Sequence, residues 1–324
     1  MNNFRCQSPH AIHFSGGRTS GFMLHKHLEA HDGKLPEGVQ VIFCNTGKER
    51  TETLDFVERC SLEWAVPVIW LEYRYIPGEP GSPGIAVAEP VKVPVWDEDD
   101  EGETVQIGEV PGIKTTIHGR KAPKGKHTFE IVNYATASRQ GEPFEQIIQA
   151  RGFLPNVVAR FCTVEMKIRT AQRYLKSLGW DHLTSSIGLR ADEPARVSRL
   201  RGTNRHSNEE PDAPLARSGF VLDDVRRFWE SQPFDLALES YQGNCDLCFL
   251  KGRGKIQKIM RENPELAEWW IDQEKTIKSS KSARNASFRA DRPRYEHLLK
   301  QVQEQPLLPF SDEEPTIDCF CGEE

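Results

Sequence analysis

The sequence has no long apolar run, and no stretch approaches the roughly twenty apolar residues that cross a membrane. Its first residues, MNNFRCQSPH, lack the charged and then apolar pattern of a secretory signal. The charge excess is small: a formal net charge of −6 gives no global field that favours nucleic acid or an acidic partner. These absences predict a soluble cytoplasmic protein without a membrane partner, and 324 residues suffice for a full hydrophobic core.

The chain has eight cysteines. The reducing cytosol disfavours a disulfide framework, so metal ligation or thiol chemistry explains them better. Cys6, Cys44 and Cys60 are predicted to be small buried side chains. The ten histidines, His27 among them, follow no metal-ligand spacing and are predicted to be structural.

Four short apolar segments are typical of buried strands, over residues 11–14, 39–47, 67–73 and 182–190. Helical patterns follow the first two segments, so strands and helices alternate along the chain. This alternation predicts an α/β fold in which a parallel β-sheet is flanked by helices, as in Rossmann-like proteins. Ligands bind such sheets at the carboxyl ends of the strands.

Apolar residues at helical spacing also predict helices later in the chain. The clearest pattern runs from Phe161 to Leu178 and ends at Gly179. Three more helices are expected over residues 220–230, 264–277 and 292–303. Their tryptophans are expected in the core, namely Trp229, Trp269 and Trp270.

The composition divides the chain into regions. Residues 1–240 are predicted to form the α/β domain, with an insertion of one or two hairpins over residues 76–140. Residues 241–324 are predicted to form a mostly helical region that carries cysteines. The acidic run over residues 97–103 is best interpreted as a solvated loop.

A turn rich in glycine and hydroxyl groups, SGGRTS over Ser15–Ser20, joins the first strand to a helix. Glycines let the backbone approach an anion, and the helix N-terminus offers amides and a positive dipole end, so the turn suits a phosphate. It is not a Walker P-loop, because the four-residue spacer and the Gly-Lys-Ser/Thr ending are missing. A plain turn capped by Ser15 is the alternative.

The motif SGGRTS resembles the signature of the PP-loop family, the adenine nucleotide α-hydrolase-like proteins. Further stretches follow in that family's order: FCNTGKERTETLDFV, RFCTVEMK, IGLRADEPAR and GNCDLCFLKG. Together they are most similar to the phosphoadenosine phosphosulfate (PAPS) reductase-like branch met in phage and bacterial genomes. The resemblance covers most of residues 11–260.

This resemblance implies that the chain binds ATP or PAPS, with Mg²⁺ beside a bound ATP. The phosphates would lie on Ser15, Gly16, Gly17, Arg18, Thr19 and Ser20. The adenosine would lie beside Asn45, Thr46 and Gly47, and Gly188 and Arg190 match the family's glycine-rich end of the fourth strand. Thr19 stands where many ATP-cleaving relatives have Asp.

Cys245 and Cys248 form a C-x-x-C pair, and Cys162 begins a predicted helix. Three thiolates grip one ion or cluster. The set resembles the [4Fe–4S] ligands of adenylylsulfate reductases, with Phe161 in place of one cysteine, and the three ligands of certain tRNA thiolases. Zinc and unligated thiols stay open as alternatives, and Cys319 or Cys321 is a candidate fourth ligand.

The resemblance to PAPS reductases gives Cys321 a second role, as a nucleophile on a mobile tail that a thioredoxin-like partner reduces again. Arg190 and Asp192 are candidates for binding phosphate or sulfate and orienting a proton donor, although a structural ion-pair network explains them equally well. The basic segment Lys275–Arg294 suits a nucleic-acid backbone, and a solvated loop is the alternative.

These expectations describe a PAPS reductase-like enzyme that binds an adenine nucleotide and reduces or transfers sulfur, with an iron–sulfur cluster. Two alternatives stay open. One is a sulfurtransferase that thiolates tRNA or another nucleic acid, and the other is a nucleotide- or nucleic-acid-binding module without catalysis.

Overall fold

The computed structural model describes residues 2–77, 95–96, 104–105, 125–202, 209–243, 245–279 and 286–305. The chain divides into two compact units. One consists of residues 76–126, in which β4 (Val95–Trp96) and β5 (Thr104–Val105) pair antiparallel. This pair agrees with the expected hairpin, whereas the acidic run lies outside the described residues. The other unit consists of residues 1–75 and 127–324 and holds the rest of the described structure.

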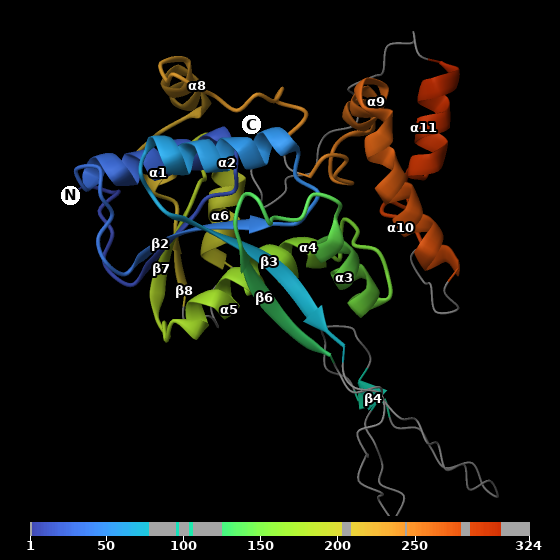
Figure 1. The fold of residues 1–324 in the computed structure, drawn as a ribbon, viewed down its shortest axis with the longest axis horizontal. Coiled ribbons are helices and arrows are strands. Elements are labelled where there is room, and N and C mark those ends of the chain that lie inside the picture. The colour runs from blue at the N-terminus through green and yellow to red at the C-terminus, as the bar shows by residue number, and fades with distance from the viewer. Residues whose placement is uncertain are drawn as a thin grey trace, which may run out of the picture. The chain divides into compact units, whose positions relative to one another are not determined.

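The larger unit is built on a six-stranded sheet in the order β6-β3-β2-β1-β7-β8 (Figure 1). The strands are β1 (His10–His13), β2 (Val39–Asn45), β3 (Val68–Ile76), β6 (Lys126–Val132), β7 (Leu183–Ile187) and β8 (Glu209–Asp212). Four neighbouring pairs are parallel: β1 with β2, β1 with β7, β2 with β3, and β7 with β8. The predicted α/β class with a mostly parallel sheet is therefore confirmed.

The described residues also form α-helices. They are α1 (Arg18–Ala30), α2 (Thr51–Glu63), α3 (Glu142–Arg151), α4 (Phe161–Thr163), α5 (Arg169–Ser177), α6 (Pro194–Gly202), α7 (Pro214–Arg217), α8 (Leu222–Glu230), α9 (Arg253–Glu262), α10 (Ala267–Ser279) and α11 (Tyr295–Glu304). The helix predicted from Phe161 is present, but its middle, Val164–Ile168, is a π-helical turn. Among the described residues, no helix has the length and apolar character that a membrane crossing requires.

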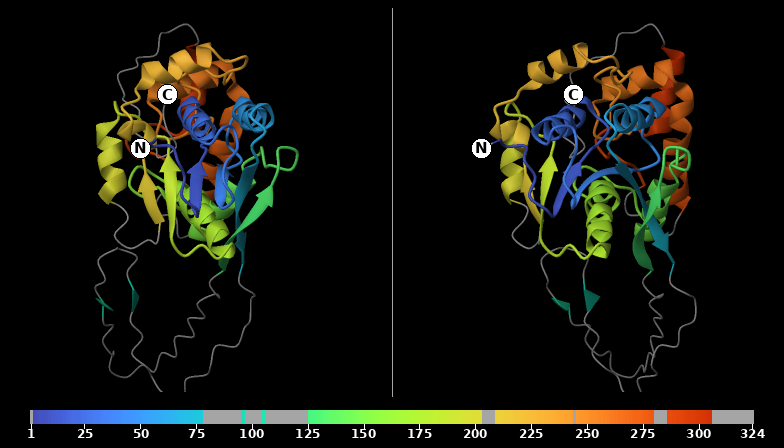
Figure 2. Two further views of the ribbon diagram at one scale, coloured as in Figure 1. Left: turned by 90° about the vertical axis from the view of Figure 1, so that its left-hand side faces the viewer. Right: turned by 60° about the vertical axis from the view of Figure 1, so that its left-hand side comes forward.

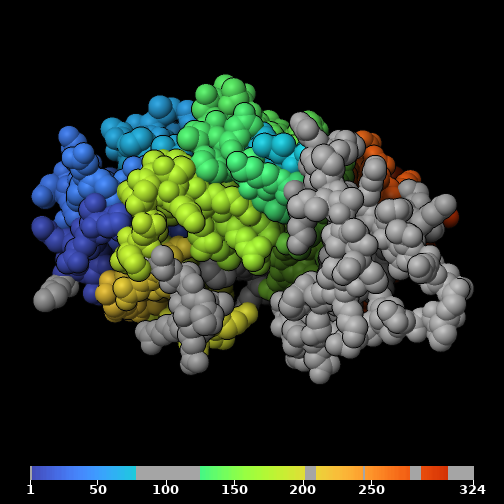
Figure 3. Space-filling model, turned by 90° about the horizontal axis from the view of Figure 1, so that it is seen from below, coloured from blue at the N-terminus to red at the C-terminus, as the bar shows by residue number. Residues whose placement is uncertain are grey.

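The strands separate two apolar layers because successive side chains point to opposite faces. On one face, Ile12 and Phe14 join a buried cluster with residues of α1 and α2. On the other face, Ala11 packs in a cluster with residues of α5. Figures 1 and 2 show α1 and α2 on one side of the sheet and α5 on the other. Seen from below, α5 and β6 occupy the middle of that second face (Figure 3).

A third cluster joins the C-terminal helices to the end of β3. It contains Tyr73, Phe144, Trp270 and Tyr295, all buried. The Trp270 and Tyr295 rings stack with centroids 5.3 Å apart. The core positions predicted for Trp229 and Trp270 are confirmed, and Trp269 is partly buried against this cluster.

The segment after the insertion belongs to the sheet. The insertion is expected over residues 76–140, yet the smaller unit ends at Lys126 and β6 takes an edge position beside β3. After β6, the Ser138 main chain donates to the Glu72 carboxylate at 2.6 Å. Residues 127–140 therefore help to shape the carboxyl edge of the sheet.

Candidate functional site

The order in which the chain adds strands to the sheet reverses at β1. From β1 the chain places β2 and β3 on one side and β7 and β8 on the other (Figure 2). In an open parallel sheet, ligands bind beyond the carboxyl ends of the strands at this switch point. Two predicted segments meet there, since a Cβ atom on Gly188, after β7, would lie 3.1 Å from the Cα of Ser20.

The Ser15–Ser20 turn is held by its own hydroxyl groups. Ser20 Oγ accepts from the Ser15 main-chain N–H at 3.1 Å, shares a hydrogen bond of 2.9 Å with Ser15 Oγ, and donates to the Gly17 carbonyl at 2.9 Å. Gly16 has φ +84°, and a Cβ there would lie 2.6 Å from Thr53 Cγ2 on α2. Only glycine therefore allows the turn to lie this close to α2.

The N-terminus of α1 suits an anion. Its N-cap residue is Gly17, no side chain caps it, and its first turn has no acidic residue. The alternative in which Ser15 caps this helix is wrong in that respect, because Gly17 is the N-cap residue and the Ser15 hydroxyl bonds to Ser20 instead. The positive end of the helix dipole and the N–H groups of a first helical turn favour an anion in general.

Arg18 and Arg190, the two arginines assigned to this site, make different contacts. The Arg18 guanidinium binds Asp235 through Nε at 2.7 Å and Nη2 at 2.9 Å, and it also donates to the carbonyls of Leu236 and Leu238. The main chain of Arg18 is therefore part of the turn, while its charged side chain connects α1 to the segment after α8. Arg190, in contrast, is buried and donates to Thr19 Oγ1 at 3.0 Å.

Arg190 also belongs to an ion-pair network. Its Nε lies 3.0 Å from the Asp192 carboxylate, and its Nη1 lies 3.5 Å from Glu193, which also binds Arg196. Asp192 in turn accepts from the Leu222 main chain at the start of α8. The network holds a buried cation against the first turn of α1, as the structural interpretation of these charges predicts. Binding of phosphate or sulfate by Arg190 stays a prediction.

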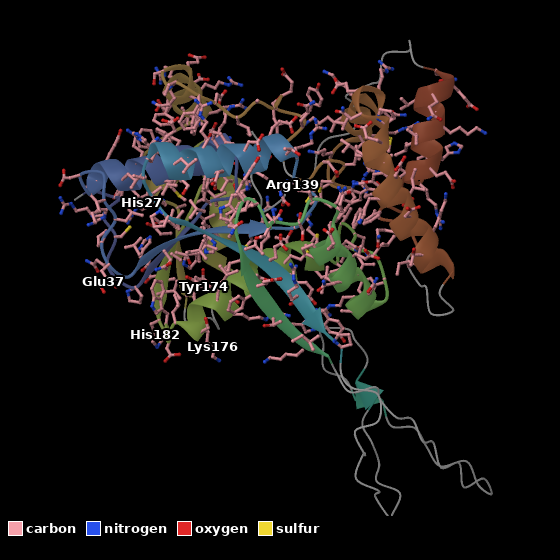
Figure 4. The ribbon with its side chains drawn as sticks, in the orientation of Figure 1. His27, Glu37, Arg139, Tyr174, Lys176 and His182 are labelled. Carbon is pink, nitrogen blue, oxygen red and sulfur yellow. The ribbon has the colours of Figure 1, made fainter. Side chains whose placement is uncertain are left out.

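The turn after β2 is the second part of the site. Asn45 donates to Glu72 at 2.6 Å and to the Ser138 carbonyl at 2.8 Å, and its oxygen accepts from the Gly47 main chain at 3.1 Å. The buried Asn45 side chain thus shapes the turn from within. Arg139, on the segment that meets this turn, donates to the carbonyls of Ala137 and Tyr134 (Figure 4).

The C-x-x-C segment docks on this turn. Glu49 and Cys245 form an antiparallel bridge, and Asp246 donates its main-chain N–H to the Lys48 carbonyl at 2.8 Å. Thr46 Oγ1 lies 3.4 Å from Cys245 Sγ and donates to Glu49 at 2.6 Å. A cysteine predicted as a ligand therefore lies against the turn predicted to line the adenosine.

A buried ion pair strengthens this contact. Lys48 Nζ lies 2.9 Å from Asp246 Oδ2, with 6% and 3% of the two residues exposed. The other Asp246 oxygen accepts from Trp270 Nε1 at 2.7 Å. Lys48 also lies 5.2 Å from the centre of the Trp269 ring. These contacts link the turn after β2, the C-x-x-C segment and α10.

The three predicted metal ligands share one apolar environment. Cys245 and Cys248 belong to the C-terminal cluster with 9% and 8% exposure, and Cys162 packs against it. All three are outside disulfides. Cys319 and Cys321 lie outside the described residues.

Part of the basic segment Lys275–Arg294 lies in the described structure. Lys275 pairs with Glu296 at 2.9 Å, and Arg289 pairs with Asp291. Arg292 donates to the carbonyls of Phe249 and Lys251, each at 2.8 Å. These basic side chains tie the C-terminal helices to the segment that follows the C-x-x-C pair.

One cluster of side chains that could bind a metal ion was not predicted from the sequence. A ring nitrogen of His10, a ring nitrogen of His27 and the Cys6 sulfur all lie within 4.8 Å of one another. The three positions have no regular spacing, so no motif marks them. Cys44 and Cys60 are buried as predicted, whereas Cys6 is intermediate in exposure.

Comparisons with known proteins give one relative. The uncharacterized nin region protein ORF290 of Escherichia phage lambda is 27% identical over 246 residues, which span 76% of this chain and 67% of that protein. No family model matches the chain. No solved structure matches it either.

Proposed function

We propose that this chain is a PP-loop enzyme of the PAPS reductase-like branch, which binds an adenine nucleotide at the carboxyl edge of its sheet and reduces or transfers sulfur. One observation carries the proposal: the Ser15–Ser20 turn follows β1, and on the neighbouring strand β2 the next turn holds Thr46 3.4 Å from Cys245 Sγ. A phosphate-type turn and a thiol thus lie at adjacent strand ends.

The nucleotide would be held mainly by the backbone. The first turn of α1, which no side chain caps, would contribute main-chain N–H groups, and the hydroxyl groups of Ser15 and Thr19 would be further donors. Arg190 adds a buried positive charge through its contact with Thr19. Charge on a phosphate is most strongly stabilised by such preorganised donors where water is excluded.

The sulfur chemistry would come from the cysteines. Three buried or partly buried thiols that belong to one apolar cluster or pack against it would hold an iron–sulfur cluster on Cys162, Cys245 and Cys248, or a zinc ion. A bound cluster would supply redox or sulfide chemistry next to the nucleotide. In the reductase form, a thiolate, for which we propose Cys321, attacks the sulfur of the nucleotide sulfate and expels the nucleotide phosphate. A second thiol, supplied by a thioredoxin-like partner, then frees sulfite and leaves a disulfide.

An ATP-dependent sulfurtransferase is the second candidate, because three cysteines leave one coordination position for sulfide. The identity of the nucleotide that binds distinguishes the reductase from the sulfurtransferase. We expect calorimetry on anaerobically purified protein to show micromolar binding of PAPS or adenylylsulfate for a reductase, and of ATP for a sulfurtransferase. Sulfite release with a reductant supports the first, and pyrophosphate release with a nucleic-acid acceptor supports the second. Binding without either product points to a non-catalytic module.

A matched pair of variants tests the binding site. Arg190→Gln removes a charge-assisted contact, which is worth about 1.5–3 kcal/mol, or about 10- to 150-fold in Kd. Arg59→Gln changes an arginine of α2 that pairs with Glu63 and should leave Kd unchanged. Equal affinities of the two variants, with unchanged melting temperatures, would refute the assigned site.

A spectrum of the anaerobic protein tests the cysteine site. We expect a brown protein whose visible absorption disappears in Cys245→Ala and persists in Cys60→Ala, a buried cysteine of the other face. A colourless protein containing zinc would remove the cluster from the proposal.

A further inference from the structure

Three metal-ligating side chains converge at the amino end of β1, away from the carboxyl edge. Cys6 lies on the N-terminal segment, His10 is the first residue of β1, and His27 lies in the last turn of α1. Their ligand atoms lie within 4.8 Å of one another, and Cys6 Sγ is 3.3 Å from His27 Nδ1. Figure 4 shows His27 between α1 and the strands.

Each imidazole is oriented by an oxygen. His27 Nδ1 donates to the Phe4 carbonyl at 2.7 Å, and His10 Nε2 shares a hydrogen bond of 2.8 Å with Ser186 Oγ. Histidines that bind a metal through one ring nitrogen commonly form a hydrogen bond to an oxygen through the other. Because a carbonyl only accepts, this bond places the His27 proton on Nδ1 and leaves the lone pair on Nε2.

That lone pair has no partner in the part of the chain that the structure describes. His27 is 1% exposed, and its Nε2 has no hydrogen bond among those residues. An unpartnered buried nitrogen is costly, and a bound ion would satisfy it.

We propose that Cys6, His10 and His27 bind one zinc-class transition-metal ion that ties the N-terminal segment to β1 and α1. One thiolate and two imidazoles bind zinc more strongly than they bind hard cations such as Mg²⁺. Zinc takes sulfur at about 2.3 Å and nitrogen at about 2.0–2.1 Å, so tetrahedral ligand atoms lie about 3.5 Å apart. The ligand atoms, which lie within 4.8 Å of one another, therefore have to move closer together when the ion binds.

Binding is a proton exchange without electron transfer. The Cys6 thiol releases its proton to solvent as the sulfur bonds to the ion, and both histidines bind through existing lone pairs. The charge of the ion would stabilise the bound thiolate.

The test counts zinc on the full chain, with its other cysteines in place. After equilibrium dialysis against zinc and elemental analysis, Cys6→Ser and His27→Gln should each bind one equivalent less than the unchanged protein. Cys60→Ser and His182→Gln are matched controls and should bind the full amount. Cys245→Ser should lose only the ion of the other site, which keeps this inference separate from the proposed function.

Cobalt identifies the ligands independently of folding. The difference spectrum between the cobalt-loaded unchanged protein and cobalt-loaded Cys6→Ser should show a thiolate-to-cobalt charge-transfer band and tetrahedral d–d bands. Zinc should also raise the melting temperature of the unchanged protein more than that of His27→Gln. Equal zinc content in Cys6→Ser and the unchanged protein, or a difference spectrum without the thiolate band, would overturn the proposal.

Discussion

The contact between the turn after β2 and the C-x-x-C segment depends on one buried ion pair. Lys48 and Asp246 lie 2.9 Å apart, both almost wholly buried, and Asp246 also accepts from Trp270 and from the Leu247 main chain. Lys48→Met keeps much of the side-chain volume and removes the charge. The Asp246 carboxylate then stays in an apolar environment without its cation.

The expected loss of stability is large. Removing one partner of a buried pair costs about 3–5 kcal/mol, whereas replacing both partners by neutral groups costs much less. The double variant Lys48→Met/Asp246→Asn retains an oxygen for Trp270 and leaves no buried charge. It should therefore be more stable than Lys48→Met alone, by about 1–3 kcal/mol.

Urea unfolding followed by tryptophan fluorescence measures both effects, because Trp269 and Trp270 lie beside the pair. The reactivity of the native protein with a thiol reagent gives a local measure, since loosening the segment should expose Cys245. A loss below about 1 kcal/mol in Lys48→Met, or losses that simply add in the double variant, would refute the reasoning.

Three further substitutions test the turn and the pH dependence of stability. Gly16→Ala and Gly33→Ala both place a side chain at φ near +85°, but only at Gly16 does the new Cβ meet another atom, Thr53 Cγ2 at 2.6 Å. In thermal unfolding, Gly33→Ala should cost about 1 kcal/mol and Gly16→Ala clearly more, and equal costs would contradict the packing argument. Burial pushes the pKa of Glu209 up, but the charge and hydrogen bond of His13, with Ser185 and Gln172, hold it at about 2, below the ordinary 4.5. Its contribution to stability is therefore complete above pH 4.5 and lost as the pH falls toward 2, so Glu209→Gln should flatten the stability profile in that window. An unchanged acid profile in Glu209→Gln would contradict it.

Much of the fold follows from local pattern. The segments that form β1, β2 and β3 carry buried apolar residues, and the segment that forms β7 begins and ends with an apolar residue, so their sequences predict them. β8 has the sequence Glu-Glu-Pro-Asp, which has low strand propensity, and it exists because it pairs with β7 at the edge of the sheet. The strand β6 is half exposed, and it likewise forms because it lies beside β3 in the sheet.

The site was partly predictable for a similar reason. Parallel strands bring their carboxyl ends to one edge, so the approach of Gly188 to Ser20 follows from the topology. Pairings over long separations do not follow from pattern. Asp235 lies on a loop 217 residues further along the chain and binds the Arg18 guanidinium. Cys6 contacts His27 only once α1 packs on the sheet.

The central claim is that the amide-rich turn Ser15–Ser20 grips an adenine nucleotide beside the cysteines. Hydrogen exchange on the anaerobic protein, with and without saturating ATP, PAPS or adenylylsulfate, tests it most directly. With at least one of these nucleotides, the account predicts slower exchange in peptides that cover residues 15–21, 45–49 and 188–193. Unchanged exchange in residues 15–21 with every nucleotide that binds would contradict it.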